Sequence, residues 1–222
     1  MEKLVAAPRP AHRLVPSRFP PIGLFDTVAT AADAAAVMEL AGWTNDRLVA
    51  ERIDRLPRDQ WVYGRANASI VMASFLHVAP GGMRFNGPDL GAWYAAASIV
   101  TAAAEVGHHL RREAVARSVK GMRRTYRNYT AALIGDYRDI RGRQTALPEA
   151  YASDSYDAAQ AFGEGVRASL ASGLLYDSLR HRGGCNIVAY RPVGVTEVVQ
   201  AEHFEISVEA ASRRIEVRKL SA

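Results

Sequence analysis

Hydrophobic and polar positions follow a helical period in four stretches of the chain. In the clearest one, from Ser98 to about Val119, apolar side chains recur every three to four residues and form one stripe. The members of this stripe are Ile99, Ala103, Val106 and Leu110. Ser98 is a suitable N-cap for this long helix. Similar patterns predict helices at residues 30–42, 44–56 and 156–172, each of which ends at or just before a glycine or proline.

Shorter apolar or alternating runs predict β-strands. They lie at residues 12–15, 61–63, 92–97, 174–176, 186–190, 195–201, 203–207 and 215–220. Two further segments, residues 69–76 and 123–134, stay open between helix and strand, because the pattern in a short run does not separate the two. Helices and strands do not alternate regularly as in β-α-β units, so the sequence favours the α+β class over a doubly wound sheet.

The size and composition are those of an ordinary globular domain. The chain has 222 residues, of which 49% are hydrophobic and 23% charged, which excludes a wholly disordered protein. The longest apolar run, residues 95–104, is too short to span a bilayer, and residues 1–21 lack the apolar core of a signal peptide. The single cysteine, Cys185, excludes a disulfide framework and a multi-cysteine metal site. We therefore expect a reduced, cytoplasmic compartment.

The positive charge is concentrated in one segment. The chain carries 28 basic and 23 acidic residues, a net charge of +5. Residues 111–143 hold 10 basic and 3 acidic side chains, so this segment alone has a surplus of seven positive charges. Two interpretations stay open: a solvated helix face, or a basic arm that binds an acidic partner, a phosphate-bearing ligand or nucleic acid.

Three polar features could carry chemistry. Residues 81–87 form a glycine-rich loop whose Arg84 could bind a phosphate or a carboxylate. The polar face of the long predicted helix carries Thr101, Glu105, His108, His109 and Arg112. This face suits solvent exposure, and its adjacent histidines point apart, which disfavours a metal site. Ser178 follows an apolar strand without a Gly-x-Ser-x-Gly elbow, so a turn-capping role is the simpler interpretation.

Three stretches taken together resemble the RES-domain family, which is named for an Arg, a Glu and a Ser. They are Gly82-Met83-Arg84-Phe85-Asn86-Gly87, then Trp93-Tyr94-Ala95-Ala96 with Ala102-Ala103-Ala104-Glu105, and last Gly173, Tyr176, Ser178 and Arg180 followed by Gly183-Gly184-Cys185-Asn186. The close spacing of Arg84, Tyr94 and Glu105 makes the joint match far more specific than any single part. Met83 is a departure, because many members have glycine there.

The first arginine of the family pattern has two candidates. Arg13 fits the local pattern of an arginine within an apolar strand, and it requires an insertion at about residues 26–75. Arg65 is the alternative that fits by spacing to Arg84. The resemblance implies a single domain over residues 1–222. Its fold would be α+β and ADP-ribosyltransferase-like, a mixed sheet core with flanking helices and a helical insertion near the N-terminus.

The resemblance also implies an activity. RES proteins are usually toxins of bacterial toxin–antitoxin pairs and consume NAD+ as a substrate, without a metal. Glu105 would stabilise the oxocarbenium-like ribose as the catalytic carboxylate, together with Arg84 and Ser178. Arg13 and Arg84 would bind the phosphates. Tyr94 would stack on the nicotinamide ring, and Ser178 would hydrogen-bond its amide or a phosphate.

Partners and acceptor follow from the same resemblance. We expect a cognate antitoxin with a helical DNA-binding domain, no membrane partner and no direct nucleic-acid partner. A target protein is the favoured acceptor of ADP-ribose. The alternative is an NAD+ glycohydrolase or phosphorylase without a protein target. A second alternative is a non-catalytic, arginine-rich protein that binds nucleic acid or a partner.

Overall fold

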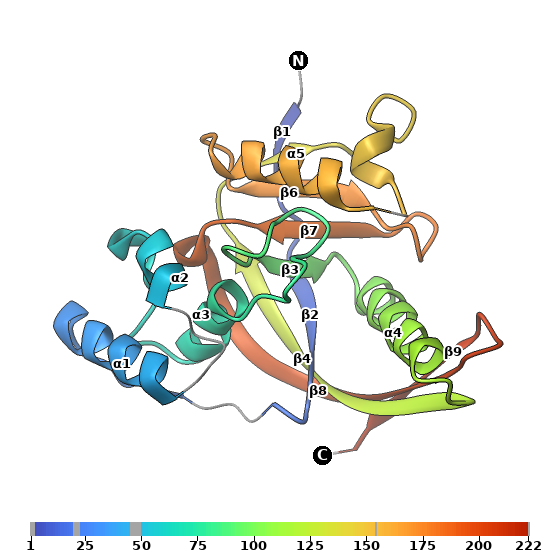
Figure 1. Cartoon of the computed structure of the whole chain (residues 1–222), viewed down its shortest axis with the longest axis horizontal. Coiled ribbons are helices and arrows are strands. Elements are labelled where there is room, and N and C mark those ends of the chain that lie inside the picture. Colours follow the sequence, from blue (N-terminus) through green and yellow to red (C-terminus); the bar gives the residue numbers. More distant parts are fainter. Residues whose placement is uncertain (1–2, 20–22, 45–49, 154, 222) are drawn as a thin grey trace.

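One mixed β-sheet with helices on both faces organises the chain (Figure 1). This architecture is seen in a computed structural model that describes residues 3–19, 23–44, 50–153 and 155–221. Within those residues, nine strands follow the order β1-β5-β6-β7-β3-β2-β4-β8-β9 across the sheet. The strands β5 and β6 pair in parallel, whereas the other neighbouring strands are antiparallel. The expected α+β class with a mixed sheet and flanking helices is confirmed.

The strands and helices have the following bounds. The strands are β1 Lys3–Ala6, β2 Ala11–Pro16, β3 Trp93–Ala96, β4 Gly121–Leu133, β5 Asp136–Asp139, β6 Gly173–Asp177, β7 Cys185–Ala189, β8 Val195–Glu209 and β9 Ile215–Leu220. The α-helices are α1 Ala31–Thr44, α2 Ala50–Arg55, α3 Ala68–Leu76, α4 Ile99–Ala116 and α5 Asp157–Arg167. Three short 3-10 helices are η1 Arg58–Gln60, η2 Pro148–Tyr151 and η3 Pro192–Gly194. Among the described helices, none is both long and apolar enough to cross a membrane.

The two segments that the sequence left open resolve in opposite ways. Residues 123–134 lie almost entirely in β4, which pairs with β2 on one side and β8 on the other. Residues 69–76 lie in α3, whose first turn is capped by Asp26: its carboxylate accepts hydrogen bonds from the backbone of Asn67 and Ser69, at 2.9 Å each. This distant cap satisfies N–H groups that a helix start leaves free, and the run itself contains no signal for it.

Sequence patterns misplaced some strands. The strand expected at residues 61–63 is wrong, because Val62 donates its backbone N–H to the Met72 sulfur, at 3.3 Å, instead of to a neighbouring strand. The strands β1 and β5 were not predicted. They are short and pair with each other at one edge of the sheet. The two strands expected at residues 195–201 and 203–207 are one strand, β8, which crosses from η3 to the far edge.

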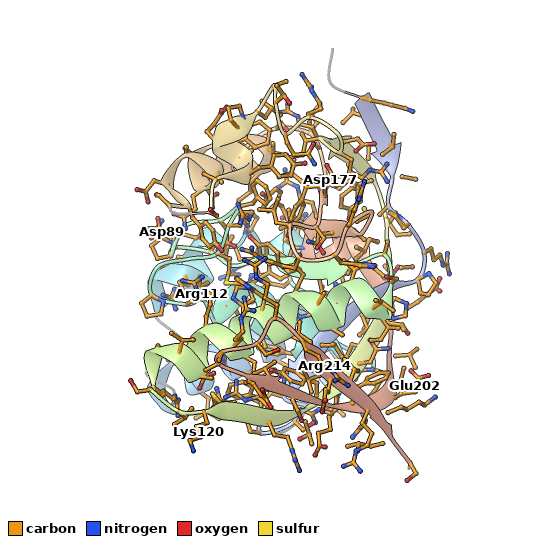
Figure 2. The ribbon with its side chains drawn as sticks, turned by 90° about the vertical axis from the view of Figure 1, so that its right-hand side faces the viewer. Asp89, Arg112, Lys120, Asp177, Glu202 and Arg214 are labelled. Atoms are coloured by element: carbon orange, nitrogen blue, oxygen red, sulfur yellow. The ribbon has the colours of Figure 1, made fainter. Side chains whose placement is uncertain are left out.

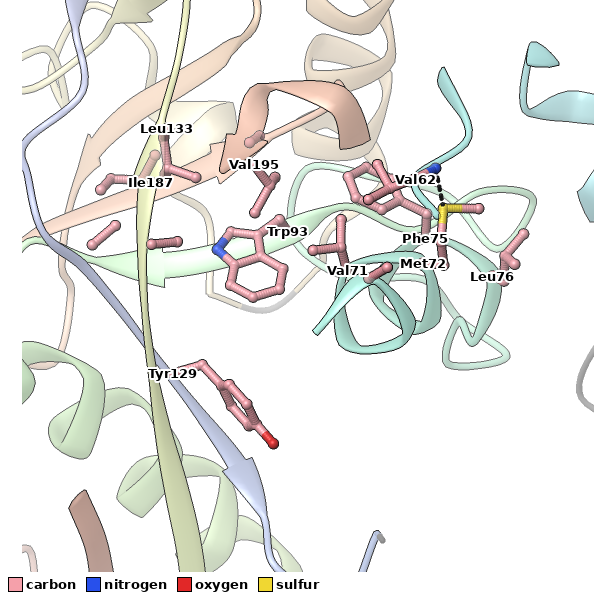
Figure 3. Packing of buried hydrophobic residues seen from close by; sticks show 14 of the residues in the cluster. Val62, Val71, Met72, Phe75, Leu76, Trp93, Tyr129, Leu133, Ile187 and Val195 are labelled. Atoms are coloured by element: carbon pink, nitrogen blue, oxygen red, sulfur yellow. Dashed lines mark hydrogen bonds between the residues drawn. The ribbon is translucent and has the colours of Figure 1, made fainter. Parts of the chain in front are cut away.

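Successive side chains of the central strands point to opposite faces of the sheet and pack in two different layers. On one face, Trp93, Leu175 and Ile187 pack with residues of α1 and α3 in the largest hydrophobic cluster of the described residues. Figure 3 shows Trp93 and Ile187 in this cluster beside Val71 of α3. On the other face, Leu174 and Val188 pack under α5, and Ala96 packs under α4. Residues 26–75, where the sequence predicts a helical insertion, contain α1, α2, η1 and most of α3, which cover the first face (Figure 1).

Candidate active site

A pocket opens on the second face of the sheet, between α4, the ends of β6 and β7, and the loop that carries Arg84. Its volume is about 260 Å³. Figure 2 looks onto this face, with α4 crossing in front and Asp177 marking the end of β6 above it. Four of the sequence-predicted site residues line the pocket: Arg13, Arg84, Tyr94 and Glu105. The fifth, Ser178, is buried directly behind Glu105.

Glu105 projects from the second turn of α4. Its Oε1 atom accepts two short hydrogen bonds, from the Ser178 hydroxyl and from the Asn186 side-chain amide, each at 2.7 Å. Its Oε2 atom accepts none from the described residues, so this oxygen is available to a ligand. The polar face expected to meet solvent therefore faces a pocket, and Glu105, His108 and His109 all line it.

Ser178 orients Glu105 and at the same time closes a turn. Its hydroxyl accepts hydrogen bonds from the backbone N–H groups of Arg180, at 3.1 Å, and His181, at 2.9 Å, while it donates to Glu105. The turn-capping interpretation of Ser178 is confirmed, and the same oxygen also positions the carboxylate. His181 ties the turn to α4 as well, because its ring nitrogen lies 2.9 Å from the Thr101 hydroxyl.

Tyr94 fixes the glycine-rich loop. Its hydroxyl accepts a hydrogen bond from the Phe85 backbone, at 3.0 Å, and donates to the Asn86 side chain, at 2.8 Å. Burial raises the pKa of this hydroxyl far above its ordinary value, which keeps it a donor. Gly82 has a φ of +70°, and a Cβ there would lie 2.3 Å from the Asn86 carbonyl oxygen, so the loop requires glycine.

Arg84 lies on the pocket wall and holds the segment that follows η2. Its Nη1 donates to the carbonyl of Ala152 at 2.7 Å and, more weakly, to that of Ala150 at 3.4 Å. The guanidinium also lies over the Tyr156 ring, 4.7 Å from its centre. Its other nitrogens donate to no described residue, so Arg84 can hold this wall and still bind a ligand.

The two candidates for the first arginine differ in position. Arg65 donates to the Val195 carbonyl at 2.9 Å and is not among the residues that line the pocket. Arg13 does line the pocket, but its Nη1 donates to the Tyr94 carbonyl at 2.9 Å and its guanidinium lies 4.9 Å from the Trp93 ring centre. Burial lowers the pKa of Arg13 to about 10. The Arg13 guanidinium thus supports β3 through the Tyr94 carbonyl and the Trp93 ring.

Sequence reasoning missed the role of Asn186 and the histidines. Asn186 belongs to the Gly-Gly-x-Asn stretch, but only the pairing of β6 with β7 brings its amide to Glu105.

The His108 pKa is lowered to about 4 by burial and by the positive charges of neighbouring groups, first among them Arg180. Within the described residues, no group of three or more His, Cys, Asp or Glu side chains is arranged to hold a metal ion.

The basic segment at residues 111–143 is not one helix face. It runs from the end of α4 through β4 and β5, so its side chains point in different directions, as Arg112 and Lys120 illustrate (Figure 2). Several of its arginines have acidic partners: Arg117 and Arg124 pair with Glu113, Arg123 with Glu205, and Arg141 with Asp139. Pairing of this kind reduces the charge that the segment offers to nucleic acid.

Comparison with known proteins identifies the family of the chain and a solved structure to which it is similar. Residues 50–209 match the RES domain family, a range that contains Arg65 but not Arg13. Among solved structures, the chain is similar to the MbcT–MbcA toxin–antitoxin complex of M. tuberculosis. The identity is 18% over 60% of this chain and 74% of that chain, with a TM-score of 0.43. No curated protein matches the chain.

Proposed function

The chain belongs to the RES-domain family, and from that membership we propose that it is the toxin of a toxin–antitoxin pair that breaks the nicotinamide–ribose bond of NAD+. The family pattern supplies the class of reaction. The contacts of Glu105 support the assignment of the central residue. We place the activity in the cytoplasm, where NAD+ is abundant.

One observation carries the proposal: a carboxylate oxygen fixed by two side-chain donors beside an open pocket. Ser178 and Asn186 both donate to Oε1 of Glu105 at 2.7 Å, which fixes the plane of the carboxylate and leaves Oε2 for a ligand. Cleavage of the nicotinamide–ribose bond develops positive charge on the ribose. A carboxylate that is already oriented stabilises this charge without reorganisation.

The chemistry of the pocket walls fits the rest of the substrate. The pocket of about 260 Å³ is lined by Arg84 and Arg180, and guanidinium groups recognise phosphates. Ligand pockets commonly measure roughly 300–1,000 Å³, so this pocket would enclose the nicotinamide half and leave the adenosine half towards the surface. The Tyr94 ring lines the pocket and would stack on the nicotinamide.

Each residue then has one part in the reaction. Glu105 stabilises the ribose cation and accepts a hydrogen bond from a ribose hydroxyl, while nicotinamide leaves as the neutral base with the electrons of the broken bond. Ser178 and Asn186 orient Glu105. Arg84 binds a phosphate. The geometry of Arg13 favours a supporting part, through the Tyr94 carbonyl, in place of the phosphate contact that the family resemblance implies.

The acceptor of ADP-ribose is proposed to be a side chain of a target protein. The nucleophile attacks the anomeric carbon of the ribose and loses a proton. Water or phosphate as acceptor would give NAD+ hydrolysis or phosphorolysis in its place. Mass spectrometry of the products separates the three cases, because they yield a modified protein, free ADP-ribose, or a phosphorylated ADP-ribose.

An antitoxin with a helical DNA-binding domain is the proposed partner. A chain that consumes NAD+ without restraint would stop growth, so a partner must block the pocket. Induction of this chain alone should arrest growth, and co-expression with the neighbouring gene of its operon should restore it. Unrestricted growth at a high level of the lone chain would contradict the toxin assignment.

A direct assay tests the activity. The purified chain is incubated with NAD+ without added metal, and nicotinamide is measured over time. We expect release by the wild-type chain and by Glu39→Gln, since Glu39 is exposed on α1 and absent from the pocket, but not by Glu105→Gln. Unchanged NAD+ in the presence of phosphate and cell extract would contradict the proposal.

A further inference from the structure

Arg180 differs from the other two arginines that line the pocket, because its guanidinium has no partner in the part of the chain that the structure describes. It lines the pocket beside Glu105, and among the described residues its guanidinium has no hydrogen bond and no ion pair. Arg84 and Arg13, in contrast, each donate to backbone carbonyls and lie over an aromatic ring. A partly buried guanidinium that is left without an acceptor is prepared for an anion from outside.

The backbone of Arg180 is held rigidly. Its N–H donates to the Ser178 hydroxyl at 3.1 Å, and the same hydroxyl donates to Glu105. The turn is closed further by a hydrogen bond from the Ser178 backbone to the Gly184 carbonyl, at 2.8 Å. The Ser178 hydroxyl oxygen therefore contacts both the Glu105 carboxylate and the Arg180 backbone, which holds the Arg180 backbone close to Glu105.

The His108 imidazole and the Arg112 guanidinium lie near Arg180, since the charges of Arg180 and Arg112 both lower the pKa of His108. His108 and Arg112 follow Glu105 on α4 by three and seven residues, about 4.5 and 10 Å along the helix axis. Desolvation lowers the pKa of His109. Glu105 opposes this, whereas the charges of Arg112, Arg180 and Arg84 lower the pKa further. Three guanidinium groups thus act on one imidazole, and Glu105 is the acidic group that acts on it. The positive charges of Arg112, Arg180 and Arg84 therefore surround the same imidazole as the Glu105 carboxylate.

We infer that Arg180, with the α4 face around His108 and Arg112, forms the binding site for the diphosphate of the substrate. This inference rests on the proposed function and adds to it the position of the anion subsite. In NAD+ the diphosphate lies one ribose away from the bond that breaks, so its site must lie close to Glu105 without contacting it. Arg180 meets this requirement because Ser178 ties it to Glu105.

Binding measurements with fragments of the substrate test the subsite. Affinities for ADP-ribose, inorganic pyrophosphate and nicotinamide are measured by calorimetry for the wild-type chain, Arg180→Gln, Arg180→Lys and Arg182→Gln. Arg182 is a matched control, because it lies two residues further along, is exposed and does not line the pocket. Melting temperatures of all four proteins establish that each is folded.

Loss of the charged contact should weaken ADP-ribose and pyrophosphate about 10- to 100-fold in Arg180→Gln. Arg180→Lys should lose less, since it keeps the charge but not the fork. The affinity for nicotinamide should change by less than about twofold in every variant, because nicotinamide carries no phosphate. All affinities of Arg182→Gln should also change by less than about twofold, because Arg182 does not line the pocket. Equal ADP-ribose affinity in the wild-type chain and Arg180→Gln would overturn the inference, as would a wild-type chain that binds neither phosphate ligand.

The same measurements separate this inference from the proposed function. A chain that releases nicotinamide normally but binds ADP-ribose independently of Arg180 keeps the function and loses the subsite. A chain that binds ADP-ribose through Arg180 and releases no nicotinamide keeps the subsite and loses the function.

Discussion

The strands β3, β6 and β7 present two faces that are similarly buried but differently used. On one face, Trp93, Leu175 and Ile187 are fully buried among apolar side chains. On the other face, Tyr176 and Asn186 are only 8% and 4% exposed, yet they line the pocket. Burial therefore does not distinguish the core of this protein from its site.

The two faces differ in what their side chains contact. On the apolar face, side chains contribute area removed from water, and their loss leaves a cavity. On the pocket face, the Asn186 amide donates a hydrogen bond to Glu105. The Tyr94 hydroxyl forms hydrogen bonds with the loop that carries Arg84. Side chains that satisfy and orient other polar groups are expected to affect activity more than stability. Four predictions test this comparison.

The largest effect is expected on the pocket face. Glu105→Gln keeps the size and hydrogen-bonding capacity of the side chain but removes the charge that opposes the ribose cation. Turnover of NAD+ should fall by about two to four powers of ten, with little change in NAD+ affinity. The melting temperature should stay close to that of the wild-type chain. Full activity of Glu105→Gln would remove the carboxylate from the mechanism.

Leu175→Ala tests the apolar face of β6, next to Tyr176 in sequence. It removes a fully buried side chain from the largest cluster and should cost about 2–5 kcal/mol in the free energy of unfolding. Denaturant titration measures this loss. Turnover per folded molecule, measured at low temperature, should change less than about threefold. A strong loss of turnover in fully folded protein would show that the two faces are coupled.

The side chains that orient Glu105 should give an intermediate effect. Asn186→Ala removes one of two donors to Oε1 of Glu105 and should lower kcat by about 5- to 100-fold, with KM changing less, since a partly buried charged acceptor loses a hydrogen bond. Ser178→Ala should lower kcat less, because a water molecule can replace the Ser178 hydroxyl as acceptor for the backbone N–H groups of the turn. Cys185→Ala is the control, because Cys185 packs against the apolar cluster on the other face. Equal kcat in all three variants would contradict an orienting role.

The smallest effect concerns pH. The His108 pKa is lowered to about 4 by burial, Arg180, His109, Arg111 and Arg112, whereas an unfolded histidine titrates near pH 6.5. Between these values the unfolded chain binds a proton that the native chain does not, so this group lowers stability as pH falls from about 6.5 towards 4. His108→Gln removes that contribution. Its melting temperature should decline less steeply over this range, whereas parallel curves would contradict the lowered pKa.

Local patterns predicted the elements whose own residues specify them. The helix α4 was expected from its apolar stripe and its N-cap, and the Ser98 hydroxyl does accept the Thr101 N–H at 3.2 Å. The strands β3, β6, β7 and β9 were expected from short apolar or alternating runs. The strands β1 and β5 were not, because each has only four residues, too few to show a pattern, and their pairing at the sheet edge makes them strands.

For the site, the sequence predicted which residues belong to it, but not how they contact one another. Arg84, Tyr94, Glu105 and Ser178 were chosen because their spacing matches a family pattern, and four separate elements bring them to one place. Their contacts could not be read from spacing. These contacts depend on which strands pair and on which face of the sheet each side chain lies. This holds for the hydrogen bond from Asn186 to Glu105, for the packing of Arg13 on Trp93, and for the exposure of the Arg180 guanidinium to the pocket.

The sequence by itself determined the α+β class, the long helix that carries Glu105 and the membership of the RES-domain family. These features follow from residues close together in the chain, where period, caps and spacing act directly. Tertiary structure decided that a polar helix face lines a pocket. It also decided that, among the described residues, Arg13 and Arg84 in this pocket have hydrogen-bond partners and the Arg180 guanidinium has none. The physical reason is that a hydrogen bond acts over about 3 Å in space, whereas Ser178 and Asn186 reach Glu105 across 73 and 81 residues of sequence.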